Sequence, residues 1–351
     1  MLWLGFMDKK KQEELSGKRT MLADVVPLDV PMAIQIGVTN ACNLQCEFCE
    51  HSSDKFKKVK KENLDCRLVE KFVYNIKENG KKINQILLSG IGEPLVNRQI
   101  VDMVKIISES KITDRIGIIS NGTLLDRHLS DSLIDAGLNV LRISLNGLSR
   151  EDYRKYTGVA IEFERFYENL NYFFQKACET RKEENRDIKV YIKIMDYMLE
   201  DTKDKKNIFM EKFAPICDIL NIEHLNIASP DIDYNKFGNR DYERSRRGTD
   251  HEKGEICPRV FYEGIISHEG QVLACCHDFW FSPNQLVMGD LRKENFLDIW
   301  NGKKFQELRL RILKGDLQGT ICENCTEYKG LMSKEDNIDS RREELICYYN
   351  K

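Results

Sequence analysis

Six short apolar runs alternate with amphipathic stretches between residues 33 and 225, and this alternation limits the possible folds more than any other feature of the chain. We expect strands at Ala33–Thr39, Gln85–Leu88, Ile116–Ser120, Val140–Leu145, Lys189–Met195 and Ile219–Leu225. We expect helices at Leu64–Glu78, Gln99–Glu109, Leu125–Ala136, Ile161–Arg181 and Lys203–Phe213. This order predicts parallel βα units of an α/β fold. In such folds the functional loops follow the carboxyl ends of the strands.

Three cysteines follow the first expected strand directly, in the run Cys42-Asn-Leu-Gln-Cys46-Glu-Phe-Cys49. Three thiolates on one short loop can hold three irons of a cubane [4Fe–4S] cluster, and the fourth iron then has no protein ligand and is free to bind a substrate or cosubstrate. A structural zinc site would normally have four protein ligands. Part of a zinc knuckle, or three buried thiols, are the simpler alternatives for this spacing.

The C-x₃-C-x₂-C run, with the aromatic Phe48 just before its third cysteine, resembles the defining loop of the radical S-adenosylmethionine (SAM) enzymes. The resemblance implies a partial, open (β/α)6 barrel of the TIM-like type, which fits six βα units better than a closed eight-unit barrel does. It also implies that the open iron binds the amino and carboxylate groups of SAM. Reductive cleavage of SAM would then give a 5′-deoxyadenosyl radical that abstracts hydrogen from a substrate.

The second expected strand leads into Ser89-Gly-Ile-Gly-Glu-Pro, which resembles the GGEP motif of the same family with Ile91 between the glycines. Glycines let a backbone approach a ligand closely, and exposed carbonyls can accept hydrogen bonds from the SAM ammonium group. The resemblance therefore implies that Gly90, Gly92 and Glu93 bind SAM. A simple turn is the alternative, but the position after a strand favours a site.

The third and fourth expected strands end in Ser-Asn-Gly-Thr at residues 120–123 and Ile-Ser-Leu-Asn-Gly at residues 143–147. These segments look like the TNG and ISLDG motifs of the family, each with one residue changed. The resemblance makes Asn121 and Ser144 candidates for hydrogen bonds to the SAM ribose or carboxylate, and Lys193 a weaker candidate. Tight turns are the alternative for both Asn-Gly pairs. Asn146 stands where the family commonly has aspartate, so an inherited carboxylate role is in doubt there.

Four residues near the ends of the late strands are candidates for substrate contacts or for a catalytic base: Tyr191, Lys193, Glu223 and His224. A base must lie within hydrogen-bonding reach of the proton it removes. The sequence does not supply that geometry, so these side chains could equally lie on the surface.

A second cysteine pattern lies in the last third of the chain and consists of Cys257, Cys275, Cys322 and Cys325. Four thiolates can complete the ligands of a cubane. The pattern resembles the SPASM and twitch domains of radical SAM enzymes, in which a β-hairpin and a helix hold auxiliary iron–sulfur clusters. A full SPASM domain has further cysteines after its C-x₂-C pair, whereas residues 326–346 contain none. The resemblance therefore implies one auxiliary [4Fe–4S] cluster.

Cys276 is the main ambiguity at this second site, because side chains of adjacent strand residues point to opposite faces and only one of Cys275 and Cys276 can face the cluster. The Gly270-x₄-Cys275 spacing favours Cys275. Zinc is the rival metal, and His277 would offer it an alternative ligand. Cys347 is a remote candidate for a thiol that donates hydrogen to a substrate radical.

Composition excludes several classes of function. The 54 basic and 57 acidic residues give a net charge of −3, which provides no electrostatic footprint for nucleic acid or an anionic membrane. No segment approaches the roughly 18 to 20 apolar residues that cross a bilayer. We expect a cytoplasmic protein, where twelve cysteines point to metal ligation or redox chemistry rather than to disulfides. A flavodoxin- or ferredoxin-like protein is the expected electron donor.

Three functions remain open for a chain with a leader at residues 1–31, a radical SAM barrel at 32–240 and an auxiliary-cluster domain at 250–351. The first is oxidation or epimerisation of a small hydroxylated molecule such as an amino sugar or a sugar nucleotide. A dehydrogenase with a single auxiliary cluster that oxidises an aminocyclitol is the nearest analogy by architecture. The second is a maturase that modifies a ribosomal peptide or a protein side chain. The third is a non-enzymatic metal-binding module, which would require the barrel motifs to be accidental.

Overall fold

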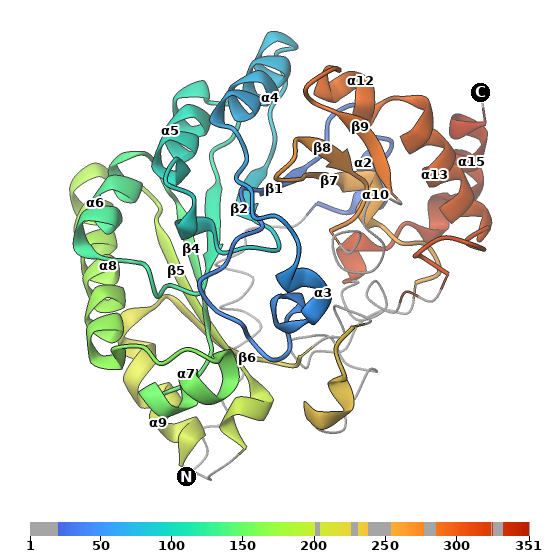
Figure 1. The fold of residues 1–351 in the computed structure, drawn as a ribbon. Helices are drawn as coiled ribbons and strands as arrows, with labels where there is room; N and C mark the ends of the chain where they lie inside the picture. Colours follow the sequence, from blue (N-terminus) through green and yellow to red (C-terminus); the bar gives the residue numbers. More distant parts are fainter. Residues whose placement is uncertain are drawn as a thin grey trace.

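A single curved sheet connects the barrel to the C-terminal region. The computed structural model describes residues 20–200, 204–225, 231–237, 254–276, 286–323, 325 and 333–350. Within these residues, the strand order is β6-β5-β4-β3-β2-β1-β7-β8-β9 (Figure 1). The strands are β1 Ala33–Gly37, β2 Gln85–Ser89, β3 Ile116–Ser120, β4 Val140–Leu145, β5 Lys189–Met195, β6 Ile219–Glu223, β7 Glu263–Ile266, β8 Gln271–Leu273 and β9 Val287–Asp290.

Strands β1 to β6 are parallel, each beside the next in sequence, and helices cover one face of them (Figure 1). This confirms the expected α/β fold with an open six-unit barrel. The barrel helices are α4 Cys66–Glu78, α5 Ile100–Ser110, α6 Arg127–Asp135, α7 Arg150–Thr157, α8 Phe163–Glu184 and α9 Lys205–Phe213. Short helices are α2 Leu22–Val25, α3 Asp54–Lys57, η1 Glu50–Ser52, η2 Pro94–Val96, η3 Asp196–Leu199, η4 Ala214–Ile216 and η5 Tyr234–Phe237.

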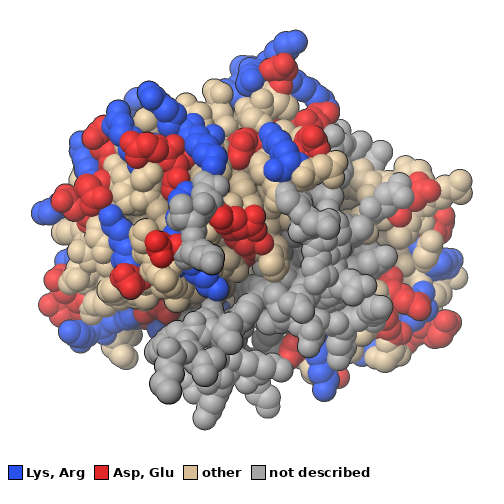
Figure 2. All heavy atoms as spheres, turned by 90° about the horizontal axis from the view of Figure 1, so that it is seen from below, with Lys and Arg blue, Asp and Glu red and all other residues tan. Residues whose placement is uncertain are grey.

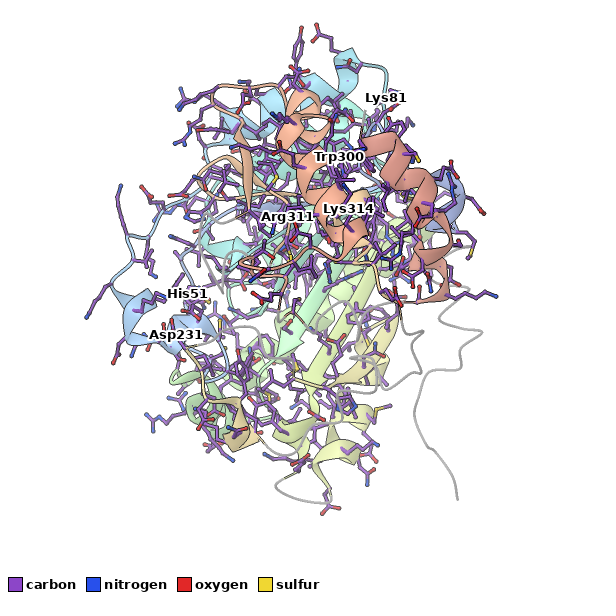
Figure 3. All side chains as sticks on the ribbon, turned by 90° about the vertical axis from the view of Figure 1, so that its right-hand side faces the viewer. His51, Lys81, Asp231, Trp300, Arg311 and Lys314 are labelled. Atoms are coloured by element: carbon purple, nitrogen blue, oxygen red, sulfur yellow. The ribbon has the colours of Figure 1, made fainter. Side chains whose placement is uncertain are left out.

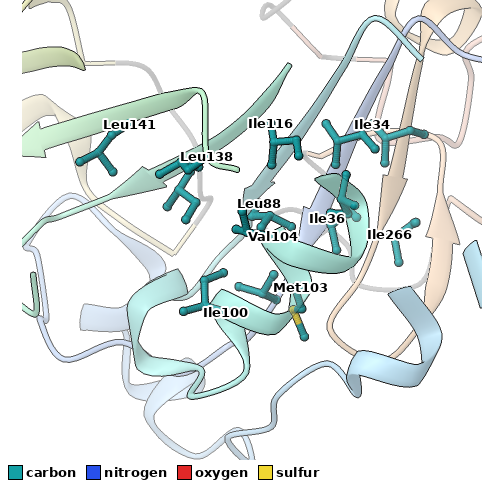
Figure 4. Packing of buried hydrophobic residues seen from close by; sticks show 14 of the residues in the cluster. Ile34, Ile36, Leu88, Ile100, Met103, Val104, Ile116, Leu138, Leu141 and Ile266 are labelled. Atoms are coloured by element: carbon teal, nitrogen blue, oxygen red, sulfur yellow. The ribbon is translucent and has the colours of Figure 1, made fainter. Parts of the chain in front are cut away.

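The core of the barrel lies between the sheet and these helices. Ile36 and Leu88 on neighbouring strands are fully buried, as are Met103 and Val104 on α5, and Figure 4 shows these side chains packed together. Each such burial contributes about 1.5–3 kcal/mol. The residues that alternate with Ile36 and Leu88 along the strands point to the opposite face. On β4 to β6 these alternate positions are mostly polar, and they turn away from the helices.

The C-terminal region extends the barrel sheet. Strand β7 pairs in parallel with β1, and β8 and β9 add in antiparallel order. The helices here are α10 Arg259–Tyr262, α12 Phe296–Trp300, α13 Lys303–Lys314, α15 Arg342–Tyr349, η6 Lys334–Asp336 and η7 Asp339–Arg341. The expected boundary between residues 240 and 250 lies outside the described residues.

The C-terminal helices are fixed to the barrel by aromatic and polar contacts. The rings of Phe72 on α4 and Phe296 on α12 meet edge to face at 5.0 Å. The Asn75 side-chain oxygen accepts a hydrogen bond from the Phe296 amide at 3.0 Å. The indole of Trp300, labelled in Figure 3, donates to the Leu28 carbonyl at 2.8 Å. Part of the expected leader therefore packs against this region.

None of the described helices is long and apolar enough to span a membrane. On the face shown in Figure 2, the described Lys and Arg side chains lie interspersed with Asp and Glu.

Candidate active site and auxiliary cluster site

The loop with Cys42, Cys46 and Cys49 follows β1 at the carboxyl edge of the sheet. A turn closes its second half, where the Cys49 amide donates to the Cys46 carbonyl at 2.9 Å. Burial raises the pKa of Cys42 to about 11 and of Cys49 to about 12, and it raises the pKa of Cys46 strongly, with further contributions from the charges of its two partners. The structure thus brings the three thiols together. Bound cations would be needed to keep them as thiolates at neutral pH.

The loop after β2 holds the cysteine loop through backbone contacts. The Gly92 amide donates to the Thr39 carbonyl at 3.1 Å, and the Glu93 amide donates to the Ala41 carbonyl at 2.8 Å. A β-carbon at Gly92 would lie 2.4 Å from the Ala41 oxygen. Gly90 has φ +126°, and a β-carbon there would lie 2.8 Å from the Gly37 Cα atom. Gly90 is therefore required by its contact with the end of β1, and Gly92 by its contact with the cysteine loop. Binding of SAM to these glycines stays a prediction.

Replacing Gly92 by alanine is expected to displace the cysteine loop, because the new methyl group meets backbone atoms that cannot rotate away. Overpacking of this kind costs about 1–3 kcal/mol. We expect a lower melting temperature and bound iron falling toward about four per chain, the content of one remaining cubane. Gly80→Ala is the control for general destabilisation, because φ +62° strains an alanine there although no atom lies within 4 Å of its β-carbon position, and it should keep its iron. Equal iron in both variants would contradict this role of Gly92.

Glu93 ties the ends of β2 and β3 together. Its carboxylate accepts hydrogen bonds from the Ser120 hydroxyl at 2.6 Å, the Asn121 amide at 2.7 Å and the Leu95 amide at 3.0 Å. Burial raises the pKa of Glu93, and these donors lower it in part. The carboxylate thus has a structural role in this protein. Its proposed contact with SAM has no geometric support of its own.

Asn121 contacts the cysteine loop through a residue that the motif does not specify. Its side-chain amide donates to the Asn43 oxygen at 2.9 Å, and Asn43 in turn donates to the Thr123 hydroxyl at 2.7 Å. The side-chain oxygen of Asn121 accepts from the Thr123 amide at 2.9 Å. The Asn121 side chain also lowers the pKa of Cys42 slightly, against the larger effect of burial. Asn43 therefore joins the site, and its position directly after the first cysteine was the only signal for it.

Two further segments support the cysteine loop. The amide of Glu47 donates to the Tyr156 carbonyl at the end of α7 at 3.0 Å. The hydroxyl of Tyr234 donates to the Phe48 carbonyl at 3.0 Å. Asp231 lies on the same side of the molecule as the loop, beside His51 and α3 (Figure 3), and pairs with Lys55 at 3.2 Å. The Phe48 side chain packs edge to face on Tyr197 at 6.3 Å, so its contacts here are aromatic.

A polar network occupies the face of β4 to β6 that is turned away from the helices. Ser144, Lys193 and Asn221 lie side by side in register across the three strands. The buried Glu223 carboxylate accepts from the Tyr191 hydroxyl at 2.9 Å and from the Lys193 ammonium at 2.7 Å. Asn221 donates to the Tyr191 hydroxyl. The structure thus brings together three of the four residues expected to contact substrate.

His224 does not join this network. It is exposed and pairs with Asp196 at 2.5 Å. His224 lies one residue beyond the end of β6, and its partner Asp196 lies one residue beyond the end of β5. Its expected role at the substrate has no support from this position.

The residues around the cysteine loop fit a cluster with SAM. Three thiols suit three irons of a cubane. Ser89 ends β2 in register with Gly37 beside that loop, and the residue is only 6% exposed. Within the described part of the chain, the buried Ser89 hydroxyl has no hydrogen-bond partner. A hydroxyl buried in this way needs a polar partner, which a bound cosubstrate with amino and carboxylate groups would supply.

The second cysteine group also comes together in space. Cys257 precedes α10, Cys275 follows β8, and the pair Cys322 and Cys325 follows α13. The pKa of Cys257 is raised to about 12, chiefly by burial and in smaller part by the charges of Cys322 and Cys325. Cys275 is likewise acted on by Cys257. Cys257 therefore lies near each of the other three expected ligands, and the assignment of all four as ligands stays a prediction.

The positions of the cysteine side chains can be compared with the needs of a single metal ion and of a cubane cluster. No group of three or more His, Cys, Asp or Glu side chains in the described ranges is placed to hold a single metal ion. In a cubane each thiolate binds a different iron, so the sulfurs need not converge on one point. His277, the alternative zinc ligand, lies outside the described residues.

Two family models match the chain. The model of the radical SAM superfamily matches residues 36–204, and that of an iron–sulfur cluster-binding domain, SPASM, matches residues 257–326. GTP 3′,8-cyclase of Alkaliphilus metalliredigens is 32% identical over 124 residues, 35% of this chain and 38% of that protein. GTP 3′,8-cyclase of Chlorobaculum tepidum is 33% identical over 142 residues, 40% of this chain and 41% of that protein. The chain thus spans about two fifths of these curated relatives.

Solved structures share the fold at low sequence identity. SuiB of Streptococcus suis bound to the precursor peptide SuiA has a TM-score of 0.60 at 16% identity, over 92% of this chain and 74% of that one. BtrN in complex with AdoMet and 2-DOIA has a TM-score of 0.51 at 17% identity, over 84% of this chain and 93% of that one. These likenesses extend over both the barrel and the C-terminal region.

Proposed function

We propose that this radical SAM enzyme, whose barrel is followed by an iron–sulfur cluster-binding domain, oxidises a small hydroxylated molecule such as an amino sugar or a sugar nucleotide. The two domains imply a [4Fe–4S] cluster with SAM in the barrel and an auxiliary cluster behind it. When bound, these groups supply a hydrogen-abstracting radical and an acceptor for one electron. Cys42, Cys46 and Cys49 would hold the first cluster, and Cys257, Cys275, Cys322 and Cys325 the second.

The observation that carries the proposal is the Glu223 network. Oxidation of an alcohol to a ketone removes a hydrogen atom, an electron and a proton, so the site needs a group that accepts the proton. Glu223 is a buried carboxylate on the face turned away from the helices, held in position by Tyr191 and Lys193. Lys193, Asn221 and Tyr191 offer the mixed donors and acceptors that bind hydroxyl groups. Epimerisation would use the same side chains but return a hydrogen atom to the substrate carbon.

The names of similar proteins give limited support. The curated relatives act, by their names, on GTP, and BtrN was solved with 2-DOIA. Modification of a peptide or protein side chain is the second candidate, because SuiB, solved with its precursor peptide, matches 92% of this chain in fold. For either substrate we propose a flavodoxin- or ferredoxin-like protein as the electron donor. A non-enzymatic metal-binding module would not account for the radical SAM match over residues 36–204.

The test is an anaerobic reaction of the purified protein with SAM, a chemical reductant and a panel of amino sugars, aminocyclitols and sugar nucleotides. We expect one of them to yield a product two hydrogens lighter, read by mass spectrometry, with no external oxidant during a single turnover. A product of unchanged mass that has taken up solvent deuterium would identify epimerisation. Cleavage of SAM with none of the panel consumed would contradict the proposal and favour a peptide substrate.

A further inference from the structure

Arg259 lies at the second cysteine group and none of the sequence motifs includes it. It opens α10, two residues after Cys257. Its guanidinium donates to the Glu263 carboxylate at 2.7 Å and to the Cys276 sulfur at 3.9 Å. The side chains of Arg259 and Glu263 are only 19% and 14% exposed. A permanently charged group is therefore held inside the protein, against the cysteines.

The charge of Arg259 reaches the expected cluster ligands as well as Cys276. Cys257 precedes Arg259 by two residues, and Cys275 directly precedes Cys276. The Cys276 sulfur is contacted by the guanidinium at 3.9 Å, whereas Cys275 is acted on by Cys257. This arrangement favours Cys275 as the cluster ligand.

A cation in this position changes the energy of an electron on the auxiliary cluster. One-electron reduction adds a negative charge to the cluster, and Coulomb interactions with a fixed charge are strong where water is excluded. Net charge and hydrogen bonds to sulfur are among the factors that set the reduction potential of iron–sulfur clusters. Arg259 would therefore favour the reduced form, and the Glu263 carboxylate would offset part of that effect.

We infer that Arg259 raises the reduction potential of the auxiliary cluster and holds the Cys276 thiol outside its ligand set. The benefit of a higher potential rests on the proposed oxidation, because it makes the auxiliary cluster a better acceptor for the electron from the substrate. The electrostatic effect itself is independent of the substrate. Arg259 is thus a positioning and tuning residue rather than a catalytic one.

The experiment measures the midpoint potential of the auxiliary cluster by redox titration followed by electron paramagnetic resonance. The Cys42→Ala, Cys46→Ala, Cys49→Ala triple variant is the parent, because it removes the signal of the first cluster. We expect Arg259→Gln to move the potential to a more negative value. Arg259→Lys, which retains the charge, should stay closer to the parent. Glu263→Gln removes the opposing charge and should move the potential to a more positive value.

Opposite shifts in Arg259→Gln and Glu263→Gln would support the inference, because a merely structural role predicts no dependence on sign. Unchanged potentials in both variants, with iron content intact, would overturn it. Should Arg259→Gln lose its iron, the Glu263→Gln titration decides alone.

The ligand assignment is tested by the iron content of two further variants of the same parent. Cys276→Ala should keep about four irons and Cys275→Ala should lose them, given four irons per cubane. The reverse result would overturn that part. Because no substrate is present, these outcomes are separate from the failure of the proposed oxidation.

Discussion

Replacing Cys42, Cys46 and Cys49 together by alanine is expected to reduce the formation of 5′-deoxyadenosine from SAM below detection. The three thiols are the only cysteines of the loop after β1, and the structure brings them together at the carboxyl edge of the sheet. Without them the first cluster has no protein ligands, so SAM has no iron to bind and no electron source. The measurement is chromatographic quantification of 5′-deoxyadenosine under anaerobic conditions with a chemical reductant.

Iron content distinguishes loss of one cluster from loss of the fold. We expect about eight irons per chain in the unmodified protein and about four in the triple variant, given four irons per cubane. A triple replacement of Cys66, Cys178 and Cys347, which belong to neither cysteine pattern, is the matched control. It should retain the iron content and the activity of the unmodified protein. A variant lacking Cys42, Cys46 and Cys49 that still produced 5′-deoxyadenosine would sink the radical SAM assignment. If the unmodified protein held about four irons together with zinc, and the triple variant of Cys42, Cys46 and Cys49 held no iron, the C-terminal site would be a structural zinc site.

The barrel could be predicted from sequence because its signal is local. Each of the strands β1 to β6 begins at the residue expected and ends within two residues of the expectation. Runs such as Ile116–Ser120 are apolar, and branched side chains such as those of Ile86 and Ile118 become fully buried. Helix α7 was not expected, because most of its eight residues are polar. The Ser149 side chain, which accepts from the Asp152 amide, and Gly158 at φ +70° were the signals that could have marked its two ends.

Other features depend on contacts between distant residues, which no local pattern records. Strand β7 pairs with β1 although about 230 residues separate them, so the continuous sheet had no signal in the sequence. The glycine motif predicted approach to a ligand, whereas Gly92 meets the Ala41 carbonyl of a neighbouring loop. Close approach to a ligand and close approach to another loop both require a residue without a side chain, so the sequence alone does not distinguish the two roles of a glycine.

The candidate substrate site could have been predicted more fully by applying strand periodicity. Side chains at alternate positions share a face, so Tyr191 and Lys193 belong together, as do Asn221 and Glu223. His224 follows the last residue of β6, so this rule does not place its side chain. What the periodicity does not supply is the pairing register, which sets Lys193 opposite Asn221 and lets the ammonium group reach the Glu223 carboxylate.

Replacing Glu223 by glutamine is expected to slow substrate oxidation by roughly 10²- to 10⁴-fold, the usual contribution of a positioned general base. The amide has nearly the shape of the carboxylate but neither accepts a proton nor carries the charge that Lys193 faces at 2.7 Å. Cleavage of SAM in the absence of substrate should continue at its original rate, because the cysteine loop is untouched. The measurement is the ratio of oxidised product to 5′-deoxyadenosine, which should fall.

Asp218→Asn provides the matched control, because Asp218 also forms a half-buried ion pair on this part of the sheet. Its carboxylate pairs with Arg181 at 2.7 Å and accepts from the Val190 amide at 2.8 Å, but it precedes β6 and so lies at the edge opposite the cysteine loop. Loss of that pair should lower the melting temperature without changing the ratio of product to 5′-deoxyadenosine. If both substitutions lowered SAM cleavage and oxidation in equal proportion, Glu223 would be a structural residue. A lowered ratio in Glu223→Gln alone identifies the carboxylate as the group that receives the substrate proton.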